Sequence, residues 1–216
     1  MSERTEELAR VEEERSFLEG RFRELVASIG PIPIASTRIM PYGWRKAAKG
    51  RTVWRIVEEV VSQNIEKNAS ELGFDYIEPA ESEVGVWDFR FSYNSRPESF
   101  VNIKSAIAGG RRNKDDLSKA EKLVQFYEQN AQANLYIATF VLEFSNDMTV
   151  KICDAICFPI AWIPDIYVNP SNNGNLQSAY YKELDRAVRR TNSEFLEEFY
   201  QEIEVANEKR RAKAMK

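Results

Sequence analysis

Three polar side chains interrupt two apolar segments in the first half of the chain. Asp88 lies in the first segment, and Asn102 and Lys104 lie in the second, Ser99–Ser105. Side chains alternate between the two faces of a strand, so Asn102 and Lys104 share one face while their apolar neighbours share the other. The polar residues Ser92–Pro97 predict a hairpin turn that brings Asp88 beside this pair. The sequence therefore predicts a carboxylate, an amide oxygen and an ammonium group at one place.

This combination of side chains is typical of metal-dependent phosphodiester hydrolysis. Mg²⁺ prefers oxygen ligands and keeps several water molecules, so one or two carboxylates and a substrate phosphate can hold it. The predicted protein ligands are Asp88, the amide oxygen of Asn102 and the main-chain carbonyl of Ile103. Lys104 would stabilise the charge that develops during hydrolysis or orient the attacking water. The alternative is that the polar residues cover the solvent face of an ordinary hairpin.

The chain contains no histidine. This absence excludes a Ser-His-Asp triad, a Cys-His nucleophile pair, histidine-ligated zinc and nucleases with a histidine general base. Hydrolysis of a phosphodiester by this chain would therefore depend on Mg²⁺ and carboxylates.

The two cysteines, Cys153 and Cys157, lie in the apolar run Thr149–Ile160. Residues four apart on a strand face the same way but are too far apart for a comfortable disulfide. We therefore expect two buried free thiols.

The composition favours one globular domain. The chain has 216 residues, of which 43% are hydrophobic, and this is enough for a single core. The densely charged stretch Ser2–Arg15 and the lack of an apolar run of about 18 residues predict a cytoplasmic protein that does not contact a membrane. The net charge of −4 argues against nonspecific DNA coating, but a site-specific enzyme needs basic residues only along its cleft.

Residues 1–30 predict an N-terminal helix with a short heptad seam. The apolar positions are spaced three, four or seven residues apart, and Arg15 occupies a skipped position. The seam would pack either on a second copy, as a dimerisation element, or on the chain's own core. Its apolar positions are Leu8, Val11, Leu18, Phe22, Leu25 and Ile29.

Residues 31–216 predict an α/β domain with a mixed β-sheet flanked by helices, extended by helices at both ends of the chain. A second helix, with an apolar face and two adjacent glutamates, would precede the two strands described above. The further expected elements are this helix at Trp44–Leu72, a helix at Asp115–Asn130, strands at Asn134–Leu142 and Thr149–Ile160, and a final helix at Asn192–Lys216.

The spacing of Asp88, Asn102 and Lys104 resembles that of the PD-(D/E)xK nuclease superfamily. In this family, an aspartate at one strand end is followed on the next strand by an acidic residue, any residue and lysine. Here Trp87 replaces the frequent proline, and Asn102 replaces the second acid, as in some type II restriction enzymes. The later order of motifs is similar to type II restriction endonucleases of the SwaI kind, from about Gly50 to Phe199. Those motifs are the strand Asn134–Leu142, the loop Val168–Pro170 and the run Arg190–Phe195.

The resemblance implies a restriction-endonuclease-like core and a Mg²⁺-dependent enzyme that cuts double-stranded DNA at a palindromic site as a homodimer. It also implies an accessory acid on the preceding helix, either Glu58 or Glu59, with a slight preference for Glu59. If Asn102 abolishes catalysis, the protein would instead bind specific DNA without cutting it. A structure-specific repair nuclease and an interaction protein built on the heptad seam are further alternatives.

DNA contacts would come from two segments with different roles. Arg111, Arg112 and Lys114 form a basic cluster that suits phosphates. The loop Asn169–Gln177 is rich in Asn and Gln, which pair with adenine edges in the major groove, although Asn and Gly are also good turn formers. The predicted base-reading residues in this loop are Asn172, Asn173, Asn175 and Gln177.

Overall fold

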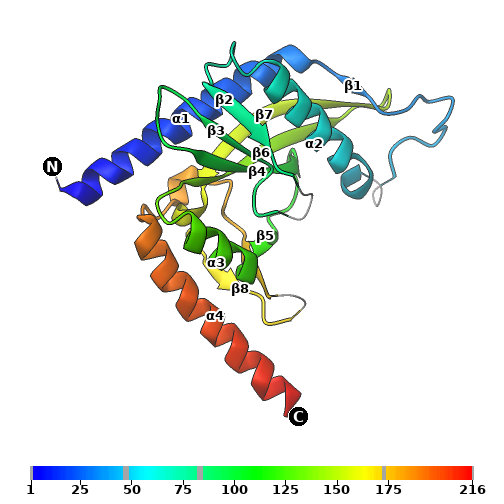
Figure 1. The fold of residues 1–216 in the computed structure, drawn as a ribbon. Coiled ribbons are helices and arrows are strands. Elements are labelled where there is room, and N and C mark those ends of the chain that lie inside the picture. The colour runs from blue at the N-terminus through cyan, green and yellow to red at the C-terminus, as the bar shows by residue number, and fades with distance from the viewer. Residues whose placement is uncertain (1, 46–48, 82–84, 172–173, 216) are drawn as a thin grey trace.

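The computed structural model describes residues 2–45, 49–81, 85–171 and 174–215 (Figure 1). It contains a six-stranded mixed sheet in which β4 and β6 run parallel and the other neighbouring strands run antiparallel. Helices flank this sheet, as the sequence predicted. In spatial order the strands are β1 (Ile32–Pro33), β7 (Thr149–Pro159), β6 (Leu135–Phe144), β4 (Ser99–Ile107), β3 (Phe89–Ser92) and β2 (Tyr76–Pro79).

The N-terminal helix α1 (Glu3–Ile29) packs along the sheet, mainly against β7 (Figure 1). Its heptad positions Leu18 and Phe22 are fully buried. The ring of Phe22 lies 6.2 Å from that of Phe89 and 5.7 Å from that of Phe140, measured between ring centroids. The seam therefore packs on the core of its own chain, and the alternative role of residues 1–30 as a dimerisation element stays a prediction.

Charged residues on the buried side of α1 are paired within the chain. Arg15, at the skipped heptad position, contacts Glu12 at 2.8 Å and Glu19 at 2.9 Å. The carboxylate of Glu14 accepts a hydrogen bond of 2.7 Å from the hydroxyl of Tyr136 on β6. Buried charges are tolerated when they are paired and hydrogen-bonded, which explains why this polar position does not break the packing.

Helix α2 spans Lys49–Lys67 and is shorter than the predicted helix Trp44–Leu72. Val53, Val57, Val61 and Ile65 recur every four residues and are fully buried, which fixes the helix to the sheet. Before the helix, the indole nitrogen of Trp44 donates to the carbonyl of Ser145 at 2.9 Å. Trp44 is thus held by a loop and lies outside the helix.

The segment expected as a helix at Asp115–Asn130 is divided. Its first part is strand β5 (Asp115–Lys119), and only the second part is helix α3 (Ala120–Gln129). The strand forms because it pairs with β9 (Asn175–Ser178) in a small antiparallel sheet completed by β8 (Tyr167–Val168). Tertiary pairing has overridden local helix propensity. Together, β5 and α3 make the crossover between the parallel strands β4 and β6.

The chain ends in helix α4 (Asn192–Ala214), which agrees with the predicted final helix. Thr191 and Glu194 form a capping box at its start, where each side chain satisfies a main-chain N–H of the other residue. Within the described part of the chain, the short 3₁₀ helices Ile160–Trp162 and Leu184–Arg186 precede it. Among the described residues, no helix is both long enough and apolar enough to cross a membrane.

A β-bulge in β7 changes the predicted state of one cysteine. Val141 of β6 pairs with Asp154, and the next residue, Leu142, pairs with Ile152, so Cys153 is an extra residue in the ladder. The bulge shifts the alternation of the strand, which leaves Cys153 exposed and Cys157 buried. The expectation of free thiols is confirmed, but the expectation that both are buried is wrong.

Candidate active site

The hairpin between β3 and β4 holds Asp88 against the neighbouring strand. The main-chain N–H of Asp88 donates to the carbonyl of Val101 at 2.8 Å, and its carboxylate accepts the N–H of Ile103 at 2.5 Å. In the connection, Asn94 and Ser95 both have positive φ and form a tight β-turn, which the N–H of Arg96 closes by donating to the carbonyl of Tyr93 at 3.0 Å. The prediction that a turn brings Asp88 beside the Asn102–Lys104 strand is confirmed.

Asn102 is buried and holds the segment before Asp88. Its side-chain amide nitrogen donates to the main-chain carbonyl of Val86 at 2.7 Å. This bond fixes the orientation of the amide, because a carbonyl can only accept. The side chain therefore has a positioning function, whatever its oxygen contacts in a complex.

Lys104 is half-buried, and its neighbour across the parallel pair is Thr139 on β6. Its positive charge opposes the rise in the pKa of both Asp88 and Glu58. The charge of one ammonium group thus acts on two carboxylates, one that precedes β3 and one on α2.

Glu58 is the more strongly perturbed of these carboxylates. Burial and the negative charge of Asp88 raise its pKa to about 7, while Lys104 and Arg55 oppose the rise. Burial also raises the pKa of Asp88, while the hydrogen bond from the Ile103 N–H and the charge of Lys104 lower it. Asp88 remains open to solvent on one side, which limits this effect.

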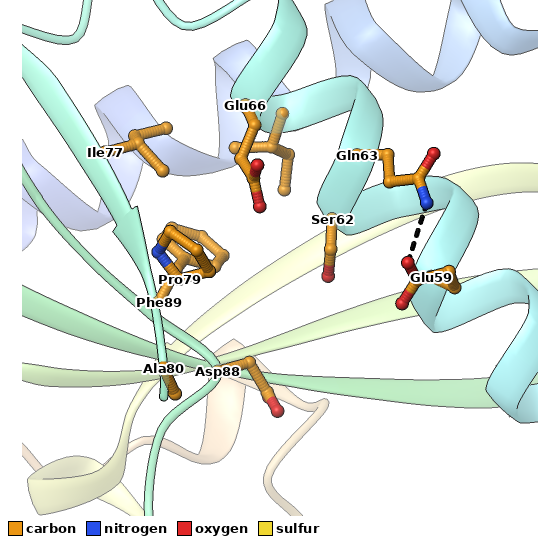
Figure 2. A pocket seen from close by; sticks show the side chains of 10 residues that line it. Glu59, Ser62, Gln63, Glu66, Ile77, Pro79, Ala80, Asp88 and Phe89 are labelled. Atoms are coloured by element: carbon orange, nitrogen blue, oxygen red, sulfur yellow. Dashed lines mark hydrogen bonds between the residues drawn. The ribbon is translucent and has the colours of Figure 1, made fainter. Parts of the chain in front are cut away.

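The electrostatic coupling to Asp88 favours Glu58, whereas a cavity beside Asp88 is lined by Glu59, so the slight preference for Glu59 as the accessory acid stays a prediction. Glu59 is exposed, and its carboxylate accepts a hydrogen bond of 2.7 Å from the side chain of Gln63, one turn further along α2 (Figure 2). Glu58 follows the buried Val57 and is half-buried at the edge of the apolar stripe, whereas Glu59 is exposed and lines the cavity beside Asp88. The helical spacing of the valines was the signal that could have shown the half-buried position of Glu58 from the sequence.

A cavity of about 270 Å³ adjoins the site between α2 and the β2–β3 edge. Asp88 forms part of its wall, and Figure 2 shows Glu59 and Ser62 projecting from α2 toward it. The wall also contains Gln63 and Glu66, so the cavity has polar oxygens on its helix side. It provides water access beside the Asp88 carboxylate.

The donor set fits a hard divalent cation. Within the described parts of the chain, no group of three or more Asp, Glu, Cys or His side chains could hold a metal. The negative charge of Asp88 contributes to the raised pKa of Glu58, so the two carboxylates are electrostatically coupled. A bound cation would relieve the repulsion between them, and Mg²⁺ commonly uses one or two carboxylates with water completing its shell.

The predicted phosphate-contacting residues are exposed, but two of them already contact the rest of the chain. Arg112 forms an ion pair of 2.5 Å with Glu183, and the ammonium of Lys114 lies 3.8 Å from the centre of the Tyr167 ring. Arg111 is exposed.

The predicted base-reading loop is partly a strand. Asn172 and Asn173 lie outside the described residues. Asn175 and Gln177 belong to β9, where pairing with β5 replaces the expected loop. The side chain of Gln177 donates to Asp116 at 2.6 Å, and the side-chain oxygen of Asn175 is buried without a hydrogen-bond partner among the described residues. Gln177 is thus committed to its own sheet in the free protein.

Comparison with known proteins gave no match to a protein-family model and no match to a curated protein.

Proposed function

We propose that this protein is a Mg²⁺-dependent endonuclease of double-stranded DNA. The observation that carries the proposal is the hydrogen bond that holds the Asp88 carboxylate against β4 next to Lys104, and the charges of both residues act on Glu58 of α2. A bound Mg²⁺ would polarise the scissile phosphate and lower the pKa of its water. The resemblance to type II restriction endonucleases supplies DNA as substrate.

Each side chain has a separate role in this proposal. Asp88 and Glu58 supply the anionic oxygens for the cation, with the main-chain carbonyl of Ile103 as a neutral ligand. Lys104 stabilises charge on the phosphate as the bond to the leaving oxygen breaks. Asn102 keeps the Val86 segment in place through its amide nitrogen. Glu58 thus replaces the negative charge that an acid at position 102 would provide.

Sequence specificity and dimer formation complete the proposal. A homodimer with two-fold symmetry would place one such site on each strand of a palindromic DNA sequence. Because the α1 seam is buried in the chain, the interface would lie elsewhere on the surface.

A second candidate is a DNA-binding protein that does not cleave. It is favoured by Asn102, which lacks negative charge and whose amide nitrogen is committed to Val86. Under this alternative, the protein binds DNA with or without Mg²⁺ and leaves the phosphodiester backbone intact.

Digestion of a bacterial genomic DNA preparation tests the two candidates. The parent protein is incubated with Mg²⁺ or with EDTA, beside the Asp88→Ala variant, and the DNA ends are sequenced. Ends at one repeated sequence, found only with parent protein and Mg²⁺, are the expected result. Intact DNA combined with measurable duplex binding would favour the non-cleaving protein, and cleavage of branched DNA alone would favour a repair nuclease.

A further inference from the structure

Two arginines from distant segments converge on one carboxylate. Arg112, in the connection between β4 and β5, contacts one oxygen of Glu183 at 2.5 Å. Arg186, in the short helix Leu184–Arg186, contacts the other oxygen at 2.9 Å. Both contacts use the Nε atom of the guanidinium group. The Glu183 carboxylate is therefore held between two cations.

The ring of Tyr180 organises the same two arginines. The guanidinium carbon of Arg112 lies 5.0 Å from the ring centre and that of Arg186 lies 4.6 Å from it. These distances are in the range of cation–π interactions, to which arginine is well suited. A ring that contacts both guanidinium groups keeps them near each other when the carboxylate leaves.

The exposure of the three charged groups differs. The side chains of Arg112 and Arg186 are 50% and 49% exposed, whereas that of Glu183 is 26% exposed. The cations are thus accessible from solvent while the anion lies deeper. Guanidinium groups match the geometry of phosphate oxygens as well as that of a carboxylate.

We propose that Arg112 and Arg186 form a clamp for a backbone phosphate of DNA, and that the Glu183 carboxylate occupies this clamp in the free protein. The inference rests on the proposed function and extends it to a second contact with the same substrate. Binding of DNA would exchange the carboxylate for a phosphodiester, so Glu183 competes with the substrate. Arg186, Glu183 and Tyr180 were not singled out in the sequence.

The clamp lies within reach of a duplex bound at the active site. Arg112 follows Lys104 by eight residues, and such a stretch spans at most roughly 29 Å. This is less than one helical turn of B-form DNA, about 34–36 Å. A single duplex could therefore contact Lys104 and the clamp together.

Binding of a labelled random-sequence DNA duplex, measured without Mg²⁺ across a salt series, tests the clamp. The Glu183→Gln variant should bind about two- to fivefold more tightly than the parent, the range expected when an exposed ion pair is lost. Arg112→Gln and Arg186→Gln should each bind more weakly and lower the salt dependence by about one unit of slope. The Arg112→Lys variant keeps the charge but loses the paired N–H donors of the guanidinium group. Its affinity for the duplex should lie between those of Arg112→Gln and the parent.

Glu24→Gln is the matched control, because Glu24 also pairs with an arginine, Arg21, on an exposed surface of α1. A similar gain in affinity for Glu24→Gln would assign the effect to net charge and overturn the clamp. Unchanged or weaker binding by a folded Glu183→Gln variant would do the same, because a purely structural ion pair gives that result. If the parent binds no duplex at low salt, both the clamp and the proposed function fail, whereas failure of the clamp alone leaves parent binding intact.

Discussion

The carboxylates of Glu58 and Asp88 come from different elements, and the charge of Asp88 helps to raise the pKa of Glu58 to about 7. Two partly buried carboxylates destabilise the fold unless one of them is protonated or a cation binds to them. The free protein relieves this cost by holding a proton near neutral pH. A divalent cation would do so at higher pH, and the pH dependence of stability can therefore report on this pair.

The first prediction concerns Glu58 in the metal-free protein. Its folded-state pKa of about 7 lies above the ordinary value of 4.5, so stability falls as pH rises from about 4.5 to 7 and then levels off. Glu58→Gln should remove this loss and be more stable than the parent above pH 7, by at most about 3 kcal/mol because solvent screens a half-buried group. Urea unfolding at several pH values measures the difference.

Glu59→Gln is the control, since it removes a charge from the exposed face of the same helix. It should follow the parent curve. In addition, Mg²⁺ should stabilise the parent above pH 7 but have a much smaller effect on Glu58→Gln. Equal stabilisation of both proteins by Mg²⁺ would remove Glu58 from the proposed metal site.

The second prediction is that Asp88→Ala abolishes cleavage and preserves duplex binding. The substitution removes a carboxylate from the proposed metal site and leaves the Ile103 N–H without its acceptor. Asp88→Asn can still accept that hydrogen bond, so it should keep the parent's stability while also losing cleavage. Nicking of plasmid DNA and duplex affinity are measured side by side. Cleavage by Asp88→Asn within a few-fold of the parent would contradict the assignment.

The third prediction is a loss of about 10²–10³-fold in cleavage rate for Lys104→Ala, the usual cost of removing one transition-state contact. The substitution also removes a cation that lowers the pKa of Glu58. The pH–rate profile should therefore move to higher pH. Single-turnover rates across pH measure both effects. A loss of rate without a shift of the pH–rate profile would mean that the charge of Lys104 does not control the pKa of Glu58 during cleavage.

The fourth prediction concerns Asn102→Asp. An added carboxylate should lower the Mg²⁺ concentration at which the ion gives half of its maximal stabilisation of the folded protein. The same change removes the donor to the Val86 carbonyl, so the metal-free variant should lose about 1–3 kcal/mol of stability. Unfolding in urea with and without Mg²⁺ tests both outcomes. A stable variant with an unchanged Mg²⁺ midpoint would mean that position 102 neither holds Val86 nor approaches the ion.

The fifth prediction tests the role of α1. Phe22 is fully buried against the sheet, so Phe22→Ala should cost about 3–5 kcal/mol of folding free energy without changing the oligomeric state. Leu8→Ala, at a half-buried heptad position, should cost less. Unfolding curves and sedimentation at equal concentrations measure these effects. If the parent is a dimer and either substitution makes it monomeric, the α1 seam forms the dimer interface and the prediction is wrong.

Much of the fold follows from local patterns in the sequence. The hairpin that presents Asp88, the valine stripe of α2 and the capped helix α4 each depend on spacing or capping within a short stretch. The same patterns place Asp88 beside the strand that carries Lys104, where the structure has Asp88 directly before β3 and Lys104 on β4. These predictions agree with the structure because residues close together in the sequence determine these features.

The differences arise where distant segments decide the outcome. Residues Asp115–Lys119 form a strand because β9 pairs with them, and the same pairing takes Gln177 out of the expected loop. The heptad seam of α1 does not reveal whether a sheet or a second helix will cover it. The coupling of Glu58 to Asp88 depends on how α2 packs across the sheet, which neither segment decides alone.

The bulge in β7 gives the two thiols opposite chemical accessibility. Cys153 is exposed, and its Sγ lies 3.3 Å from the main-chain oxygen of Val141, whereas Cys157 is sealed in the core. Burial and nearby Glu143 raise the pKa of Cys153, so alkylation should be slow at neutral pH and faster in mildly alkaline buffer. A maleimide dye would therefore attach to one defined position on the folded chain, and uptake of a second dye would report the opening of the sheet.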